Sequence, residues 1–290
     1  MTVLAFDIGG TNLRAALAAG PVTTDTLPRL LQQAPAPADI AAFCAMIGAL
    51  IAQHRPQAIG FSIPGLVRGT VCDWVPNLLW LDGADLASLF PGQPVHLAND
   101  AHMAMLAEVA AGAARDAGAA ILLAIGTGIG SALAMGGRVM RGGATSFGWA
   151  CADMAASGAP TDGWLERQAS GRALDHAARG IGLADGPALI AAARAGNPAA
   201  AQALHPAIAA LGTALAGAVA LTGADRIVVS GGVARALDVI GPPILTRLRA
   251  HLPPHLKAVT LTPCAFGPDA SLAGAAIAAM GHPAWKDDRP

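Results

Sequence analysis

The sequence predicts an α/β protein built from two similar domains. Short apolar segments of strand type alternate with helical segments, which favours a mostly parallel sheet covered by helices. A strand, a glycine turn and a returning strand occur twice, first within residues 3–18 and again within residues 121–135. The 290 residues exceed the usual size of a single core, and with 54% hydrophobic and 13% charged residues the chain can build two.

The elements of the first half follow from apolar runs and their polar boundaries. We expect strands at residues 3–6, 13–18, 58–62 and 95–97, helices at residues 39–53 and 100–114, and a loop rich in turn residues between 65 and 81. Because strands and helices alternate, ligands are expected at the carboxyl ends of the strands.

The second half starts again with an apolar strand and a glycine-rich turn. Strands are expected at residues 121–125, 131–135, 139–140, 225–230 and 258–262, and helices at residues 162–178, 199–222 and 269–280. Two further helices are expected, one after the glycine turn that follows residue 178 and one after Gly241-Pro242-Pro243. Residues 281–290 have the composition of a frayed tail.

Charge and hydropathy limit the classes of partner. The net charge is −1 with no basic or acidic block, which argues against nucleic acid and favours a small ligand in a cleft. The apolar stretches at residues 117–135 and 207–222 are interpreted as a buried hairpin and a buried helix and not as membrane spans, because they are rich in glycine or alanine. The chain starts directly in a strand without a leader segment, so we expect a cytoplasmic protein.

Cysteine spacing indicates neither disulfides nor zinc. Cys44, Cys72, Cys151 and Cys264 lie far apart and form no C-x-x-C pair. They are interpreted as buried or incidental thiols.

The first hairpin has the features of an anion site. In AFDIGGTNLRAAL, two glycines between strands allow positive φ and bring backbone N–H groups close to an anion. Asp7 at the edge of the turn offers a hard oxygen ligand, directly or through water, to a Mg²⁺ carried by a nucleotide. No Gly-Lys-Ser/Thr follows, so the turn is not a Walker loop. The alternative is an ordinary tight hairpin.

Seven motifs in chain order carry a family resemblance. They are DIGGTN, SIPGLV, PNLLW, LANDA, IGTGIG, WLERQASGRAL and VVSGGV, between Leu4 and about Ala279. Together they resemble the ROK family of bacterial sugar kinases and related repressors, within the actin-like and hexokinase-like ATPases. The resemblance implies two ribonuclease H-like domains with a cleft between them: residues 1–116, on which the C-terminal segment 270–290 can pack back, and residues 117–269.

The resemblance implies a role for Asp100 in particular. It matches the catalytic aspartate that accepts the proton of the attacking sugar hydroxyl. It opens a helix, whose N-terminus is expected to keep the carboxylate ionised. The structural alternative is that Asp100 is only the N-cap of that helix.

The other site residues also come from matched motifs. The two phosphate turns are matched by Asp7, Gly9, Gly10, Thr11 and Asn12 and by Gly126, Thr127 and Gly128, and the adenosine loop is matched by Gly231 and Gly232. Sugar hydroxyls would be bound by Gly65, Asn77, Asn99, Asp100 and Glu166, with Ser146 at one further sugar position. The implied cofactors are ATP and Mg²⁺, with Asp7 as the Mg²⁺ ligand.

Two linked departures from the family concern zinc. Most members carry a sugar-binding Glu and a zinc-binding His after the second hairpin, but Ser146 and Trp149 stand at those positions here. The cysteine cluster is replaced by residues 152–162, so no zinc site is expected. Trp149 can stack on an apolar sugar face or fill the space of the missing zinc loop.

The predicted function is ATP-dependent phosphorylation of a monosaccharide hydroxyl. A glucokinase-like activity comes first, with a fructose, amino-sugar or polyol kinase as alternatives. A sugar-sensing regulator without significant turnover is a second hypothesis, although the first motif begins at residue 5 and leaves no space before it for a DNA-binding domain. An actin-like filament or chaperone ATPase is a third, which the sugar-binding residues disfavour. The resemblance also suggests a homodimer.

Overall fold

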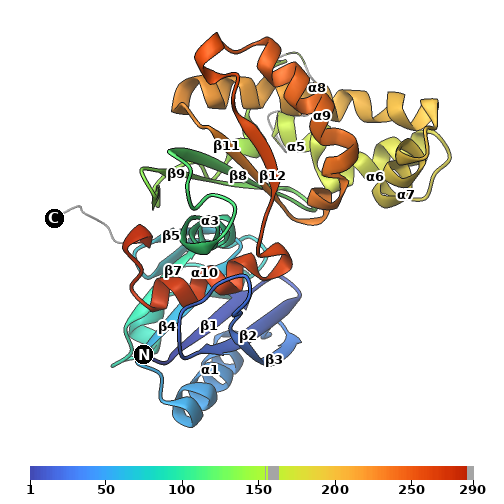
Figure 1. Ribbon diagram of the computed structural model, residues 1–290. Coiled ribbons are helices and arrows are strands. Elements are labelled where there is room, and N and C mark those ends of the chain that lie inside the picture. Colours follow the sequence, from blue (N-terminus) through green and yellow to red (C-terminus); the bar gives the residue numbers. More distant parts are fainter. Residues whose placement is uncertain (154, 156–162, 286–290) are drawn as a thin grey trace. The chain divides into compact units, whose positions relative to one another are not determined.

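The computed structural model describes residues 1–153, 155 and 163–285. The chain forms two compact units (Figure 1). The first comprises Met1–Asp116, Gly137–Gly143 and the C-terminal segment from Pro268, and the second comprises Ala117–Gly136 and Ala144–Gly267.

The first unit contains a five-stranded mixed sheet in the order β3-β2-β1-β4-β7. Its strands are β1 (Val3–Ile8), β2 (Asn12–Ala18), β3 (Arg29–Pro35), β4 (Ala58–Ile63) and β7 (Val95–Asn99). The β1–β2 and β2–β3 pairs are antiparallel, and the β1–β4 and β4–β7 pairs are parallel. The expectation of a mostly parallel sheet was therefore wrong, because short loops return the chain directly into the neighbouring strand.

Helices cover both faces of this sheet. The helix α1 (Ile40–His54) begins where the Asp39 carboxylate accepts a hydrogen bond from the Ala42 amide, at 2.8 Å. Its Phe43 side chain packs on the strand aromatics, in which Phe6 and Phe61 stack with ring centroids 5.0 Å apart. The helices α3 (Asp100–Ala111) and α10 (Ala270–Ala279) pack against each other, and α10 also contacts β1 and β4.

The segment between Pro64 and Phe90 is more ordered than the predicted loop. It contains the hairpin β5 (Leu66–Arg68) and β6 (Val71–Trp74), a 3₁₀ turn η1 (Leu79–Leu81) and the short helix α2 (Leu86–Leu89). Strand β3 was also not predicted. Its burial is irregular, so it lacks the alternation by which a half-buried strand is recognised.

The second unit repeats the design of the first. Its strands β8 (Ala119–Ile125), β9 (Ile129–Met135), β11 (Arg226–Ser230) and β12 (Thr260–Pro263) follow the order β9-β8-β11-β12. The β8–β9 pair is an antiparallel hairpin, and β8–β11 and β11–β12 are parallel. Strands β2-β1-β4-β7 of the first unit have the same order and directions, which confirms the prediction of two similar α/β domains. The short strand β10 (Arg138–Val139) follows β9 in the chain.

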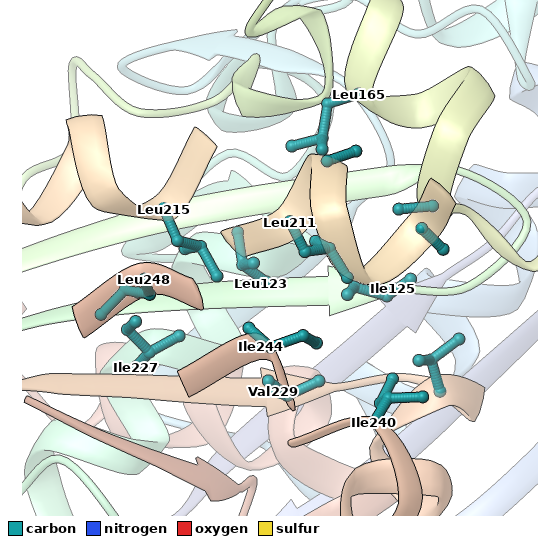
Figure 2. Close-up of a cluster of buried hydrophobic side chains, with 14 of the residues drawn as sticks. Leu123, Ile125, Leu165, Leu211, Leu215, Ile227, Val229, Ile240, Ile244 and Leu248 are labelled. Atoms are coloured by element: carbon teal, nitrogen blue, oxygen red, sulfur yellow. The ribbon is translucent and has the colours of Figure 1, made fainter. Parts of the chain in front are cut away.

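The core of the second unit lies between its sheet and its helices. Figure 2 shows Leu123, Ile125, Ile227 and Val229 of the strands facing leucine and isoleucine side chains of the helices. The helices are α5 (Trp164–Ala169), α6 (Gly171–Gly180), α7 (Gly186–Arg194), α8 (Pro198–Thr222) and α9 (Leu237–Ala250). The 3₁₀ turns are η2 (Phe147–Trp149), η3 (Gly232–Ala236) and η4 (Pro254–Leu256) here, and η5 (Gly267–Asp269) and η6 (Pro283–Trp285) towards the C-terminus.

Two helix boundaries differ from the predictions. The first residue of the helix expected over residues 162–178 lies outside the described residues. The rest of that range forms two helices, α5 and α6, which are separated at Ser170. Ser170 ends α5 and caps α6, because its hydroxyl accepts a hydrogen bond from the Ala173 amide. The helix expected after Gly241-Pro242-Pro243 instead begins at Leu237 and contains both prolines. They lie in its second turn, where neither can donate the backbone hydrogen bond of an ordinary helical residue.

Among the described helices, α8 alone is long and apolar enough to cross a membrane, by length and composition only. Its Leu211 and Leu215 side chains are almost fully buried in the core of the second unit. That pattern also fits a core helix of a globular domain.

Candidate active site

The β1–β2 turn has the geometry of an anion-binding loop. The Gly9 amide closes it by donating to the Asn12 carbonyl oxygen at 2.8 Å. The amides of Gly10 and Thr11 donate to no other described residue, and both residues are exposed. Two N–H groups are thus available to an external acceptor.

The predicted reason for the glycines was wrong. Neither Gly9 nor Gly10 has a positive φ. A Cβ at Gly10 would instead lie 3.1 Å from the Asn77 Cβ, so close packing against the Asn77 side chain favours glycine there. This contact also places Asn77, a predicted sugar-binding residue, beside the β1–β2 turn.

An arginine that the sequence analysis missed holds Asp7. Arg14 faces Asp7 across the β1–β2 ladder, and its Nη2 lies 2.8 Å from Asp7 Oδ2. Its Nη1 lies 2.8 Å from Asp269 Oδ1, and Nη2 also donates to the Pro268 carbonyl. Both hydrogen bonds from Arg14 to Asp7 end on Oδ2, so Oδ1 remains available as a ligand. The sequence contained one indication of this contact, because Arg14 is the residue that pairs with Asp7 when residues 3–18 form a tight hairpin.

Asn99 and Asp100 lie at the junction of β7 and α3, and one of them caps the helix. Asn99 is the N-cap, because its Oδ1 accepts from the Ala101 amide at 2.9 Å. Its Nδ2 donates to the Gly65 carbonyl oxygen at 2.9 Å, which joins two predicted sugar-binding residues. Asn99, and not Asp100, is therefore the N-cap of α3, although Asp100 Oδ1 also accepts from the Ala101 amide at 2.7 Å.

The electrostatics of Asp100 differ from the prediction. Burial, and to a lesser extent the negative charge of Asp7, raises the pKa of Asp100 to about 6. The hydrogen bond from the Ala101 amide lowers the pKa but does not offset the loss of hydration. The helix N-terminus therefore does not hold this carboxyl in its usual range, and the group has the pKa of a base that works near neutral pH.

The β8–β9 turn of the second unit closes in the same way as the β1–β2 turn. The Gly126 amide donates to the Gly128 carbonyl oxygen at 3.0 Å. The amides of Thr127 and Gly128 donate to no other described residue. Gly128 likewise has no positive φ, and a Cβ there would lie 2.8 Å from both carboxylate oxygens of Glu166.

Glu166, a predicted sugar-binding residue, holds this turn in the structure. Its Oε2 accepts from the Ile129 amide at 3.0 Å, and its Oε1 accepts from Arg172 Nη2 at 2.8 Å. The Glu166 side chain is 22% exposed. Its described contacts are therefore within the second unit, beside the Gly126–Gly128 turn.

A cavity of about 540 Å³ opens beside the β8–β9 turn. Gly126, Thr127, Arg172, Gly232 and Val233 are among its lining residues, with the N-terminal end of α7. Gly231 has φ +80°, and a Cβ there would lie 2.4 Å from the Ile125 carbonyl oxygen, so this glycine is needed to pack against β8. Of the two predicted adenosine-loop glycines, Gly232 lines the cavity.

The two positions that depart from the family are exposed. Ser146 lies at the surface, with its Oγ 3.5 Å from Thr145 Oγ1. Trp149 is 54% exposed, which contradicts its interpretation as core filler. Residues 154 and 156–162 of the replaced cysteine segment lie outside the described residues. The described part of the chain holds no group of three or more His, Cys, Asp or Glu side chains that could bind a metal ion.

Comparisons with known proteins agree with this architecture. Residues 3–281 match the ROK family. The chain is 32% identical over 285 residues to the bifunctional enzyme NanE/NanK of Brucella melitensis, covering 94% of this chain but only 53% of that protein. It is 30% identical over 305 residues to the N-acetylmannosamine kinase of Shigella flexneri, covering 97% and 99% of the two chains.

Solved structures show the same fold. The ROK family glucokinase of Streptomyces griseus, solved with glucose and AMPPNP, superimposes with a TM-score of 0.76 at 26% identity, covering 97% of this chain and 100% of that one. The fold and these matches define a protein with two actin-like ATPase domains, the fold of the matched sugar kinases. The chain belongs to the ROK family.

Proposed function

We propose that this protein transfers the γ-phosphoryl group of ATP to a hydroxyl of a monosaccharide, with an amino hexose as the preferred acceptor. The observation that carries the proposal is Asp100, a partly buried carboxyl with a pKa of about 6 beside Asn99 and Gly65. The names of the Brucella melitensis and Shigella flexneri relatives favour an amino hexose over the glucose first expected. The chain spans about half the length of the bifunctional relative, at 53%, and the proposal concerns only the kinase reaction.

Asp100 acts as the general base in this proposal. With a pKa of about 6, most of the carboxyl is ionised at pH 7 to 8 and accepts a proton from the attacking hydroxyl. Asn99 orients the sugar through its amide while its bond to the Gly65 carbonyl keeps that amide in place. Asn77 and Ser146 add polar groups that distinguish one arrangement of hydroxyls from another.

Backbone amides hold the phosphates in the proposal. The N–H groups of Gly10 and Thr11 in one turn, and of Thr127 and Gly128 in the other, have no described partner and suit phosphate oxygens. Asp7 Oδ1 fits a Mg²⁺ ligand, because Mg²⁺ commonly takes one or two carboxylates and completes its shell with waters and substrate phosphates. When bound, Mg²⁺ neutralises negative charge that develops on the transferred group. The nucleoside occupies the cavity lined by Gly232 and Val233.

A sugar-sensing member with little turnover is the second candidate. Ser146 favours it, because the sequence lacks the carboxylate that most family members place at this position. The observation against it is Asp100, since a receptor does not need a base with a raised pKa.

The test is an assay of ADP release, with ATP and Mg²⁺, across a panel of sugars. Glucose, fructose, mannose, N-acetylmannosamine, N-acetylglucosamine, a 3-amino hexose and polyols are compared at equal concentration. We expect the highest kcat/KM with an amino or N-acetylamino hexose and at least tenfold less with polyols. A higher kcat/KM for glucose would instead indicate preference for a hexose without a nitrogen substituent. Turnover of none of these sugars would favour the sugar sensor.

The proposal also covers the oligomeric state and the cellular location of the protein. We propose a cytoplasmic homodimer, and light scattering coupled to gel filtration measures the mass. A mass near the chain's 28.8 kDa would contradict the dimer.

A further inference from the structure

Three hydrogen bonds hold the β8–β9 turn against the junction of α5 and α6, at Gly126, Thr127 and Ile129. The Gly171 amide donates to the Gly126 carbonyl at 2.7 Å, Arg172 Nε donates to the Thr127 carbonyl at 3.1 Å, and Glu166 accepts from the Ile129 amide. The carbonyls of Gly126 and Thr127 are thereby directed to this junction. The amides of Thr127 and Gly128 remain without a described partner.

Arg172 links two of these three contacts, those of Thr127 and Glu166. Its Nε holds the Thr127 carbonyl while its Nη2 forms an ion pair with Glu166 Oε1 at 2.8 Å. The planar guanidinium can make both contacts at once because its N–H groups point in fixed directions. One side chain therefore connects the phosphate turn with the carboxylate assigned to the sugar.

Arg172 is also accessible from the cavity beside the turn. It lines that cavity together with Thr127, and its side chain is 64% exposed. Water and salt can reach the Arg172 side of its ion pair with Glu166, which weakens the pair. A polyphosphate carries more negative charge than one carboxylate and can accept two hydrogen bonds from a guanidinium, whereas Glu166 accepts one from Arg172 Nη2.

We propose that Arg172 is a positioning residue that couples nucleotide binding to Glu166. Phosphates that bind the amides of Thr127 and Gly128 compete with Glu166 for the guanidinium of Arg172. The ion pair weakens, and Glu166 Oε1 becomes free to accept a hydrogen bond from a sugar hydroxyl. The inference rests on the proposed function, since it takes Glu166 as a sugar-binding residue, and it makes nucleotide and sugar binding cooperative.

The first measurement is the affinity for AMPPNP with Mg²⁺, by calorimetry, without sugar. We expect Arg172→Gln to weaken binding about tenfold, and Arg172→Lys to weaken it less because the charge remains. Arg179→Gln is the matched control, an exposed arginine on the same helix α6, and is expected to bind as the unaltered protein does. Equal affinity of Arg172→Gln and Arg179→Gln would overturn the inference.

The second measurement is the coupling itself. AMPPNP is titrated with and without saturating N-acetylmannosamine, and in parallel with glucose. Thermodynamic linkage requires that, if nucleotide strengthens sugar binding, sugar strengthens nucleotide binding by the same factor. We expect at least a fivefold effect in the unaltered protein and in Arg179→Gln, and about none in Arg172→Gln.

The two proposals fail in different ways. Neither titration requires phosphoryl transfer, so a protein that shows the coupling but phosphorylates no sugar would contradict the proposed kinase function and leave the role of Arg172 standing. Coupling that persists in Arg172→Gln, or is absent from the unaltered protein, would overturn the role of Arg172 even if the kinase is active. Thermal unfolding of each variant establishes that it is folded, and Arg172→Lys carries the test if Arg172→Gln is not.

Discussion

Arg14 Nη2 lies 2.8 Å from Asp7 Oδ2 across the first hairpin, and the same guanidinium lies 2.8 Å from Asp269 Oδ1, 255 residues further along the chain. Asp7 opens the turn whose amides are proposed to bind phosphate, and Asp269 immediately precedes α10. A single arginine thus ties the candidate Mg²⁺ ligand to the C-terminal part of its own unit. The Arg14 and Asp7 side chains are each only 20% exposed, so these charges are poorly hydrated.

Replacing Arg14 is expected to destabilise the first unit. Arg14→Gln leaves two partly buried carboxylates without their counter-ion, and we expect a loss of about 1–3 kcal/mol in the free energy of unfolding. Urea denaturation followed by circular dichroism measures it.

The control for this change is an exposed ion pair in the same unit. The Arg68 and Asp73 side chains are 74% and 45% exposed, so Arg68→Gln should leave the midpoint nearly unchanged. Equal effects of the two substitutions would show that Arg14 is no more important than a surface residue.

Asp100→Asn should separate binding from catalysis. The amide keeps the shape of the carboxylate and an oxygen that can accept from the Ala101 amide, but it cannot take up a proton. We expect kcat to fall by about 10² or more while the dissociation constant for AMPPNP changes little. Steady-state kinetics and calorimetry measure the two quantities, and near-normal turnover would remove the assignment of Asp100 as base.

The raised pKa of Asp100 predicts opposite pH effects on activity and stability. Activity should rise with pH through about 6, since only the ionised carboxyl accepts the proton. Stability should fall over the interval from about 4 to about 6, because the folded protein keeps the proton while the unfolded chain, with a pKa of about 3.9, has lost it. Asp100→Asn lacks this titration, so its stability relative to the unaltered protein should increase between pH 4 and pH 7. A difference that is independent of pH would contradict the raised pKa.

Local patterns were sufficient to predict both hairpins and their order. The β1–β2 and β8–β9 turns follow from apolar strands on either side of adjacent or alternating glycines, a signal contained within about 15 residues. The role of the glycines was not predictable, because it depends on Asn77 and Glu166, which are distant in sequence. The pairing of Arg14 with Asp269 is likewise non-local.

Within the candidate site, contacts between residues of the same motif were the easiest to predict. Asn99 and Asp100 are neighbours, and the structure gives the capping role to Asn99 by the direction of one side chain, which sequence cannot provide. The pKa of Asp100 depends on burial and on the charge of Asp7, which is distant in sequence, so the sequence could not predict its titration. Arg172 lies within the motif WLERQASGRAL, but its contact with Thr127 spans 45 residues and could not be predicted from the motif.

The cysteines are expected to react at different rates. Cys151 is exposed, whereas Cys72 and Cys264 are buried, and burial with the nearby charges of Asp82 and Asp85 raises the pKa of Cys72 to about 12. Iodoacetamide at pH 8 should therefore modify Cys151 first and reach Cys72 only after unfolding, since the thiolate is the reactive form. Peptide mass spectrometry over time measures each rate. Modification of Cys72 as fast as Cys151 in the folded protein would contradict this burial.

Alanine substitutions at Gly274 and Gly60 would test how closely α10 packs in the first unit. A Cβ at Gly274 would lie 1.8 Å from the Met103 carbonyl oxygen of α3, and a Cβ at Gly60 of β4 would lie 2.0 Å from the Ala275 carbonyl oxygen. Neither clash involves a side chain that can rotate away, so Gly274→Ala and Gly60→Ala must displace the helix backbone and should each cost about 3 kcal/mol or more. Gly48→Ala in α1 is the matched control, because a Cβ there meets nothing within 4 Å, and it should stabilise the protein by about 0.5–1 kcal/mol. Urea denaturation of the three variants measures the difference, and a Gly274→Ala protein as stable as Gly48→Ala would show that α10 does not pack this closely on α3.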